Sequence, residues 1–138
     1  MPPLGYLLDT SVYSQPLRKS RVESALRRWS EVGDHVCAIS AVTVAEVEWG
    51  LYRQASAWMW ELFEEKLKSR LRIFPTDGPV WSEFSRMKAT QMALGRPVPD
   101  LDLLIAATAA HHGLRLATLN RRHFSLIQGL KVEDWSTP

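Results

Sequence analysis

Short apolar runs alternate along this chain with longer stretches of helical periodicity. The runs at 4–8, 36–39, 72–74, 114–119 and 130–133 predict strands, because each is bounded by polar or turn residues. Apolar positions three and four apart predict helices at 20–33, 56–71, 79–95 and 100–113, and one more that begins at Ser40 or Thr43 and ends near Leu51. This alternation indicates an α/β fold with a parallel sheet and helices on both faces.

Local signals predict several helix boundaries. Ser20 and Glu23 have the spacing of a capping box, Pro79 suits the first turn of a helix, and Gly113 suits a C-terminal stop. Asp100 or its neighbour is expected to cap the helix that follows the extended segment 97–99.

The size and composition predict one domain spanning residues 1–138. Of the 138 residues, 46% are hydrophobic and 23% are charged, the balance of an ordinary globular protein. The single cysteine, Cys37, lies in an apolar stretch and is expected to be a buried thiol, so a disulfide framework is excluded. No basic leader and no apolar run of about 20 residues is present, so the expected location is the cytoplasm, without a membrane partner.

Three carboxylates carry the candidate chemistry. Asp9 follows the first apolar run, while Glu46 and Asp102 lie near the starts of predicted helices. Ligands bind beyond the carboxyl ends of parallel strands, so these residues are expected to converge there. Converging carboxylates repel one another unless a cation lies between them, and Mg²⁺ prefers oxygen ligands. Each residue alone also has a local explanation: Asp9 as a turn cap, Glu46 as the partner of Thr43 in a capping box, Asp102 as a complement to the helix dipole.

Four strings, at 7–14, 43–51, 102–109 and 117–124, resemble the successive motifs of PIN-domain proteins, most closely the toxin subunits of VapC and FitB type. The resemblance implies a three-layer α/β/α sandwich around a central parallel sheet and a Mg²⁺- or Mn²⁺-dependent endoribonuclease. It also implies a homodimer, neutralisation by a cognate antitoxin, and assembly with that antitoxin on operator DNA. Asp9, Glu46 and Asp102 match the regular acidic positions, whereas Asn120 stands where many members carry a fourth acid and Ser11 where many carry asparagine.

For RNA cleavage by water, Asp9 and Asp102 are expected to hold the cation, with Glu46 as a ligand through water or as the base. The net charge of only +2 does not by itself indicate a nucleic-acid binder. Substrate contacts are predicted at two groups. Short polar side chains suited to the phosphate or the ion are Thr10, Ser11, Thr118 and Asn120; basic residues suited to flanking phosphates are Arg121, Arg122 and His123.

Two alternatives remain open. The chain could be a weakly catalytic or non-catalytic nucleic-acid-binding subunit of the FitAB type, acting mainly through its partner. It could also be a receiver-like phosphoryl-transfer domain in which Asp9 is phosphorylated, which requires a lysine near the pocket. The late part of the chain offers only Lys131.

Six tryptophans are a second unusual feature of the chain. Trp29, Trp49 and Trp81 fall within helical apolar stripes and are predicted to pack in the core. Trp58 and Trp60 are two positions apart, so they cannot share one helix face. One of them is expected to lie at an interface with an antitoxin or a second copy, with stacking on an RNA base as the rival interpretation.

Overall fold

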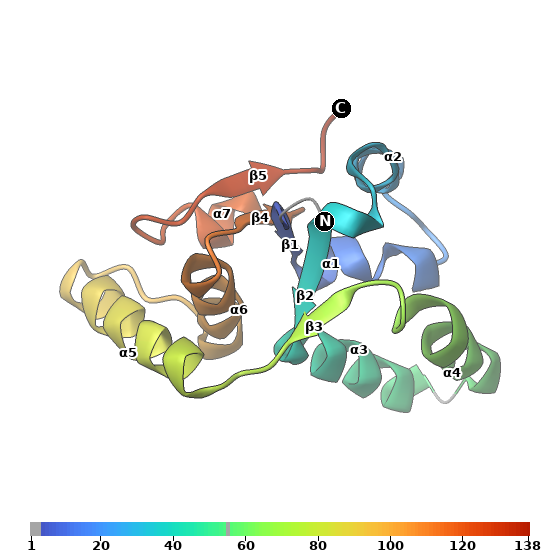
Figure 1. The fold of residues 1–138 in the computed structure, drawn as a ribbon, viewed down its shortest axis with the longest axis horizontal. Coiled ribbons are helices and arrows are strands. Elements are labelled where there is room, and N and C mark those ends of the chain that lie inside the picture. The colour runs from blue at the N-terminus through green and yellow to red at the C-terminus, as the bar shows by residue number, and fades with distance from the viewer. Residues whose placement is uncertain (1–3, 55) are drawn as a thin grey trace.

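The computed structural model describes residues 4–54 and 56–138. Their five strands form one parallel sheet in the order β3-β2-β1-β4-β5 (Figure 1). The strands are β1 (Tyr6–Leu8), β2 (Cys37–Ser40), β3 (Arg72–Phe74), β4 (Arg115–Thr118) and β5 (Val132–Asp134). The predicted parallel α/β sheet is therefore confirmed, with β1 in its centre.

Helices connect every pair of consecutive strands. The α-helices are α1 (Thr10–Tyr13), α2 (Glu23–Val32), α3 (Ala41–Gln54), α4 (Ala57–Leu62), α5 (Gly78–Ala93), α6 (Asp100–His111) and α7 (Arg121–Phe124). Two 3₁₀ turns, η1 (Gln15–Leu17) and η2 (Asp34–Val36), and one π-helical segment, η3 (Phe63–Leu67), complete the set. The single helix predicted for 56–71 is thus two segments, because the chain changes to π-helical bonding at Phe63.

Two hydrophobic cores lie on opposite faces of the sheet, because successive strand residues point to opposite sides. Leu7, Ala38 and Leu116 belong to the core beneath α5 and α6, whereas Leu8 and Ile39 belong to the core beneath α1 to α4. Figure 1 shows α5 and α6 on one side of the sheet and α3 and α4 on the other. The layers form the expected three-layer α/β/α sandwich.

The predicted capping box at Ser20 is wrong, and of the two starts predicted for the next helix only Ser40 is used; side-chain hydrogen bonds explain both. The backbone N–H of Val22 donates to the buried side chain of Gln15 at 2.8 Å, so α2 begins at Glu23 without the predicted capping box from Ser20. The hydroxyl of Ser40 accepts from the Val42 N–H at 3.0 Å, which starts α3 at Ala41 and leaves Thr43 inside the helix. Ser40 is therefore the start signal, and the capping box from Thr43 does not form.

The tryptophans divide between core and surface. Trp29 is buried as predicted, but Trp49 and Trp81 are exposed, so their predicted burial is wrong. On α3 the buried face carries Val47 and Leu51, and Trp49 lies two positions from each and therefore half a turn away. On α5 the buried face carries Val80 and Met87, and Trp81 is turned about 100° from it.

Trp58 and Trp60 lie on different faces of α4, as predicted. Trp58 is 63% exposed, whereas Trp60 is half-buried and meets Tyr52 edge-on at 4.9 Å between ring centroids. Cys37 is buried, as predicted, and burial raises the pKa of its thiol to about 12.

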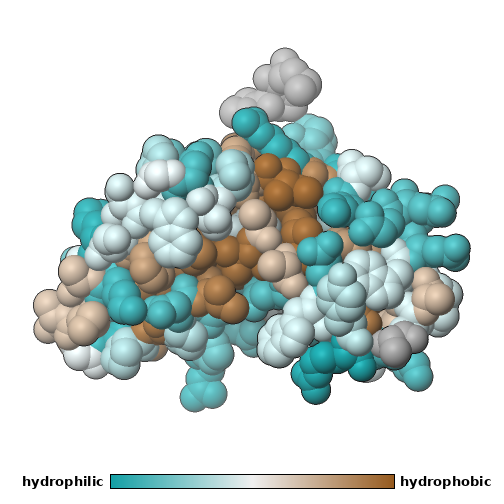
Figure 2. All heavy atoms as spheres, turned by 90° about the horizontal axis from the view of Figure 1, so that it is seen from below, coloured by the Kyte–Doolittle hydropathy of each residue, from teal (hydrophilic) through white to brown (hydrophobic). Residues whose placement is uncertain are grey.

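Several large apolar side chains remain on the surface. Figure 2 shows hydrophobic residues gathered in the centre of one face, with hydrophilic residues around them. The exposed large residues are Trp49, Tyr52, Trp58, Ile73, Trp81, Met92, Leu94, Leu101 and Leu126. In the parts of the chain that the structure describes, no helix has the length and apolar character needed to cross a membrane.

A matched pair of tryptophans tests this division between core and surface. Trp135 is fully buried against Tyr6, with 5.5 Å between ring centroids, so Trp135→Ala is expected to lower the free energy of unfolding by about 3–5 kcal/mol. Trp49→Ala removes an exposed ring and is expected to cost less than about 1 kcal/mol. Urea denaturation followed by circular dichroism measures both, and equal losses would contradict the assignment.

Candidate active site at the carboxyl ends of the strands

Asp9 is the first residue beyond β1 and is held by backbone and side-chain bonds. Its N–H donates to the Ala117 carbonyl at 2.9 Å, which completes the pairing of Leu8 on β1 with Ala117 on β4. Its side chain caps α1 by accepting the Thr10 N–H at 2.8 Å. The cap function expected from local sequence is therefore present, and it fixes the carboxylate at the end of the central strand.

Two hydroxyl groups donate to the other oxygen of Asp9. Ser11 donates to Oδ2 at 2.7 Å, and Thr118, at the end of β4, donates to the same atom at 2.8 Å. Both hydroxyls in turn accept backbone N–H groups, Ser11 from Leu119 at 3.0 Å and Thr118 from Asn120 at 2.9 Å. These acceptor bonds orient the hydroxyl protons toward Asp9, which is 4% exposed.

Glu46 reaches the site from the second turn of α3. Its Oε1 accepts the Thr10 hydroxyl at 2.6 Å, and the buried Thr43 hydroxyl lies 3.0 Å from the Thr10 hydroxyl. Glu46 is thereby joined to the turn that also carries Asp9. The sequence does not predict this role of Thr43, because its spacing from Glu46 points only to a helix cap.

Asp102 reaches the site from the first turn of α6. Its Oδ2 lies 3.5 Å from Nδ1 of His123 on α7, and His123 is well exposed. The sequence predicts His123 beside flanking phosphates, so its contact with Asp102 is an unexpected feature of the site. Nothing in the local sequence indicates it, because it depends on how α7 packs beside α6.

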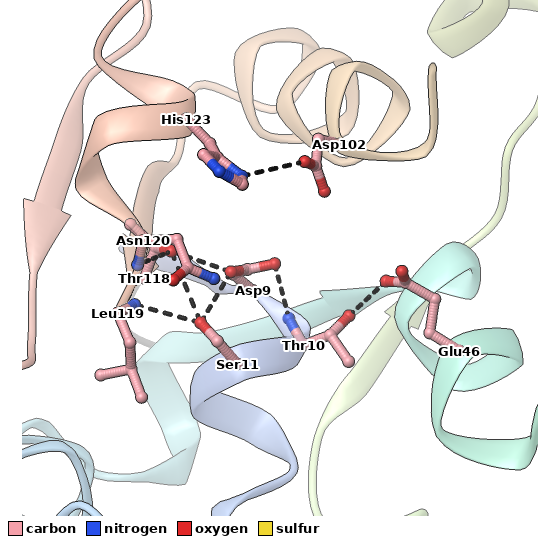
Figure 3. Close-up of polar contacts among 9 residues, drawn as sticks. All are labelled: Asp9, Thr10, Ser11, Glu46, Asp102, Thr118, Leu119, Asn120 and His123. Carbon is pink, nitrogen blue, oxygen red and sulfur yellow. Dashed lines mark hydrogen bonds and ion pairs between the residues drawn. The ribbon is translucent and has the colours of Figure 1, made fainter. Parts of the chain in front are cut away.

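The three carboxylates surround one open space (Figure 3). Partial burial raises the pKa of Glu46, and the negative charges of Asp9 and Asp102 raise it further, while the hydrogen bond from Thr10 lowers it. Burial and the charge of Asp9 likewise raise the pKa of Asp102, against the effect of His123. The three groups therefore repel one another across this space.

This arrangement fits a hard divalent cation by its chemistry. All three groups offer carboxylate oxygens, the ligands that Mg²⁺ and Mn²⁺ take in proteins, and their mutual repulsion falls when a cation enters. Among the residues that the structure describes, no three His, Cys, Asp or Glu side chains are already close enough to hold an ion.

Of the remaining predicted residues, Asn120 lies next to Thr118 at the site, whereas Asp100 and Lys131 lie elsewhere (Figure 3). Asn120 precedes α7 and is exposed, and Arg121 and Arg122 form the exposed first turn of that helix. Asp100 is exposed and pairs with Lys88 at 3.0 Å, outside the carboxylate space. Lys131, required by the phosphoryl-transfer alternative, lines a separate cavity of about 560 Å³ with Glu83 and Gln128.

A groove of about 950 Å³ begins at the carboxylate space. Thr10 and Glu46 line its inner end, and it extends along α3 to α4. Ser14 and residues 16–21 form one wall, and Ser56, Trp58 and Met59 form part of the other. The groove is therefore larger than the cavity beside Lys131, and of the three carboxylates it is lined by Glu46.

Known proteins share this fold and this length. The PIN domain family profile matches residues 6–130. The tRNA(fMet)-specific endonuclease VapC of Shigella flexneri is 29% identical, over 96% of this chain and 99% of that protein. Toxin FitB of Neisseria gonorrhoeae is 30% identical, over 94% of this chain and 97% of that protein. The crystal structure of DNA-bound VapBC from Salmonella typhimurium superposes with a TM-score of 0.81 at 27% identity, over 96% and 98% of the two chains.

The parallel sheet, the acidic space at its carboxyl edge and the end-to-end match with VapC and FitB agree with one another, and the chain belongs to the PIN domain family.

Proposed function

We propose that this protein is a metal-dependent endoribonuclease and the toxin of a VapBC-type toxin–antitoxin pair, acting in the cytoplasm. The observation that carries the proposal is the set of three carboxylates around one space, with the pKa values of Glu46 and Asp102 raised by burial and mutual repulsion. Such a site gains stability when a cation binds and can then accept the negative charge of a phosphodiester.

The names of relatives support the reaction class. The Shigella flexneri relative is named an endonuclease specific for tRNA(fMet), and two Haemophilus influenzae relatives, 29% identical, are named ribonucleases. RNA is therefore the proposed substrate here.

In this proposal Asp9 and Asp102 would hold Mg²⁺ or Mn²⁺, with Glu46 as a ligand through water or as the base. Such an ion would supply positive charge for the phosphoryl oxygens and would lower the pKa of the attacking water. Three donors hold the Asp9 carboxylate in one orientation. The ligand that Asp9 offers to the ion is therefore fixed in position relative to the reacting phosphate. Glu46 has a raised pKa, which suits a base that takes a proton from the attacking water.

The remaining predicted residues complete the proposed substrate site. Arg121 and Arg122 are exposed in the first turn of α7, the helix whose His123 contacts Asp102, and we expect their guanidinium groups to contact the phosphates on either side of the cleaved bond. Asn120 offers an amide to the same phosphates. The hydroxyls of Thr10, Ser11 and Thr118 donate to carboxylates in this structure, and contact with substrate requires them to share those protons.

Partners follow from the solved structures of relatives. FitAB bound to a DNA fragment has a TM-score of 0.89 at 27% identity with this chain, and VapBC from Salmonella typhimurium was also solved with DNA. We therefore propose a cognate antitoxin, assembly with it on operator DNA, and a homodimer of this chain. The exposed apolar residues provide surface for such contacts.

Asn120 favours one alternative. An amide here leaves one negative charge fewer than a fourth acid would, which weakens a second cation site. A weakly catalytic or non-catalytic subunit of the FitAB type, acting through its antitoxin complex, is therefore the second candidate function.

Charge removal at the site distinguishes the two functions. Asp9→Asn and Asp102→Asn are each expected to lower RNA cleavage at least about 100-fold, because even outer partners of metal ligands contribute about 10–100-fold. The control is Asp100→Asn, which removes an exposed aspartate from the same first turn of α6. Cleavage of labelled RNA is measured with Mg²⁺, with Mn²⁺ and with EDTA. If cleavage survives both site substitutions, it comes from a contaminant and not from this site.

The raised pKa of Glu46 predicts a pH-dependent stability effect in EDTA. Because the folded-state pKa lies above the usual value of about 4.3, the folded protein loses stability as pH rises through this range. Glu46→Gln removes the charge and can still accept from Thr10, so we expect it to raise the melting temperature by about 1–3 °C at pH 7. The gain should vanish well below about pH 4, where Glu46 is protonated in both states. A gain that persists there would show that the partly buried charge of Glu46 is not its cause.

Asn120→Asp tests whether a second cation site is weakened in this chain. An added carboxylate beside Asp9 is expected to lower the Mn²⁺ concentration required for half-maximal cleavage by about ten-fold, the scale on which a neighbouring group changes metal affinity. Titration of cleavage rate against Mn²⁺ measures the change. An unchanged midpoint would mean that Asp9, Glu46 and Asp102 are sufficient.

A further inference from the structure

Helix α7 places His123 at the acidic site and also carries the two arginines proposed to contact the flanking phosphates. His123 points toward Asp102 (Figure 3), with 3.5 Å between Nδ1 and Oδ2, and Arg121 and Arg122 are exposed in the first turn. The helix is only four residues long, and a single turn is not stable by itself because helix nucleation is unfavourable. The position of α7 is therefore fixed by contacts outside the helix.

The two ends of α7 are held in different ways. At the amino end, the Asn120 N–H donates to the Thr118 hydroxyl at 2.9 Å, which ties the helix to the acidic site. At the carboxyl end, the chain returns to β5 through residues 125–131, which we call the return loop. Phe124 and Ile127 anchor this end in the core beneath α5 and α6. The return loop contains no helix or strand, so its backbone groups need other partners.

A buried carboxamide on α5 binds the backbone of the return loop. Gln91 is 2% exposed, and its Nε2 donates to the Leu126 carbonyl at 2.7 Å while its Oε1 accepts the Gln128 N–H at 3.1 Å. These two backbone groups flank Ile127, so the side chain pairs with the loop as a parallel strand would. Nε2 also donates to the Arg96 carbonyl at 3.1 Å. Both donors and the acceptor of the amide are therefore used.

Gln91 occupies a position where an apolar residue would pack. It shares the buried face of α5 with Val80 and Met87, and a buried amide costs free energy unless it is hydrogen-bonded. Only a side chain that both donates and accepts can make these three bonds. Ionised glutamate cannot donate, lysine cannot accept, and methionine or leucine can do neither to any useful extent.

The end of α5 does not itself require this side chain. Backbone bonds close the helix, since the Gly95 N–H donates to the Met92 carbonyl at 3.1 Å and the Arg96 N–H to the Gln91 carbonyl at 2.9 Å. Gly95 has φ of 68°, as this kind of helix end needs. The carboxamide of Gln91 is therefore left to hold the return loop.

We propose that Gln91 is a positioning residue, which fixes the carboxyl end of α7 and thereby the places of Arg121 and Arg122 relative to the acidic site. Its effect on RNA cleavage rests on the proposed ribonuclease function, whereas its effect on α7 does not. The bonds of its side chain go to the return loop and to Arg96, and none goes to the elements that carry the three carboxylates. Loss of Gln91 is therefore expected to disturb substrate contacts and to leave the ion ligands in place.

Amide hydrogen exchange, followed by mass spectrometry without RNA or metal, tests the placement of α7. Gln91→Met keeps the length of the side chain and removes its bonds, so residues 121–127 are expected to exchange about ten-fold faster, the scale of one lost hydrogen bond. Gln91→Glu, which keeps the shape and the acceptor, is the second variant. The control is Val80→Ala, which removes buried methyl groups from the same face at the other end of α5 and should leave this segment unchanged.

Cleavage kinetics test whether α7 transmits the effect to the site. Gln91→Met is expected to raise KM for RNA about ten-fold, the scale of one charge-assisted hydrogen bond, and to leave kcat at the wild-type value. In an Arg121→Ala/Arg122→Ala background the same substitution should add nothing, because the contacts that it displaces are already absent. Val80→Ala, which loses only packing, should change neither constant. Circular dichroism shows that each variant is folded.

The outcomes distinguish this role of Gln91 from the proposed function. Gln91 is only a structural residue if its variants change exchange in residues 121–127 no more than Val80→Ala does, or if KM rises equally with and without the two arginines. A lower kcat at unchanged KM would place the effect at the carboxylates and overturn the route through α7. If the wild type cleaves no RNA with Mg²⁺ or Mn²⁺, the ribonuclease function fails, and the exchange measurement alone decides whether Gln91 positions α7.

Discussion

The position of β1 is the constraint on which the rest of the structure depends. This strand has only three residues, yet it pairs in parallel with β2 on one side and β4 on the other. Its carboxyl end therefore lies between the start of α3 and the end of β4. Asp9, the next residue, receives donors from both its own turn and β4, and Glu46 approaches from α3. Pairing across the centre of the sheet thus brings Thr118, 109 positions away along the chain, within hydrogen-bond distance of Asp9.

Electrostatics gives the two ends of the groove opposite characters. At the inner end, burial and like charge raise the pKa values of Glu46 and Asp102, so this end favours cations. Arg18, Lys19 and Arg21, which are exposed and line the groove further along, favour anions instead. A polyanion accompanied by a divalent cation satisfies both ends at once, whereas a cation or an anion alone satisfies only one. The carboxylates and these three basic residues are therefore electrostatically complementary.

The sequence predicted the parallel sheet, both layers of long helices and the positions of the three carboxylates, because strand ends and helix starts follow from apolar periodicity. It did not predict α1 or α7, since a helix of four residues is too short to show a period. Trp49 was misplaced because an apolar residue near a helical stripe can still lie half a turn from the buried face. The contacts of Thr43 with Thr10 and of His123 with Asp102 depend on packing between distant elements, which no local pattern encodes.

The use of hydroxyl groups to orient Asp9 and Glu46 has a further consequence. Ser11, Thr118 and Thr10 fix these carboxylates by donating protons, yet none of them carries charge. Lysine or arginine at these three positions would orient the carboxylate oxygens equally well. They would also form ion pairs with the carboxylates, and the site would have no net charge left to attract an ion. Neutral donors orient the carboxylates without neutralising them. The site is therefore rigid at Asp9 and still carries the negative charge that attracts an external cation.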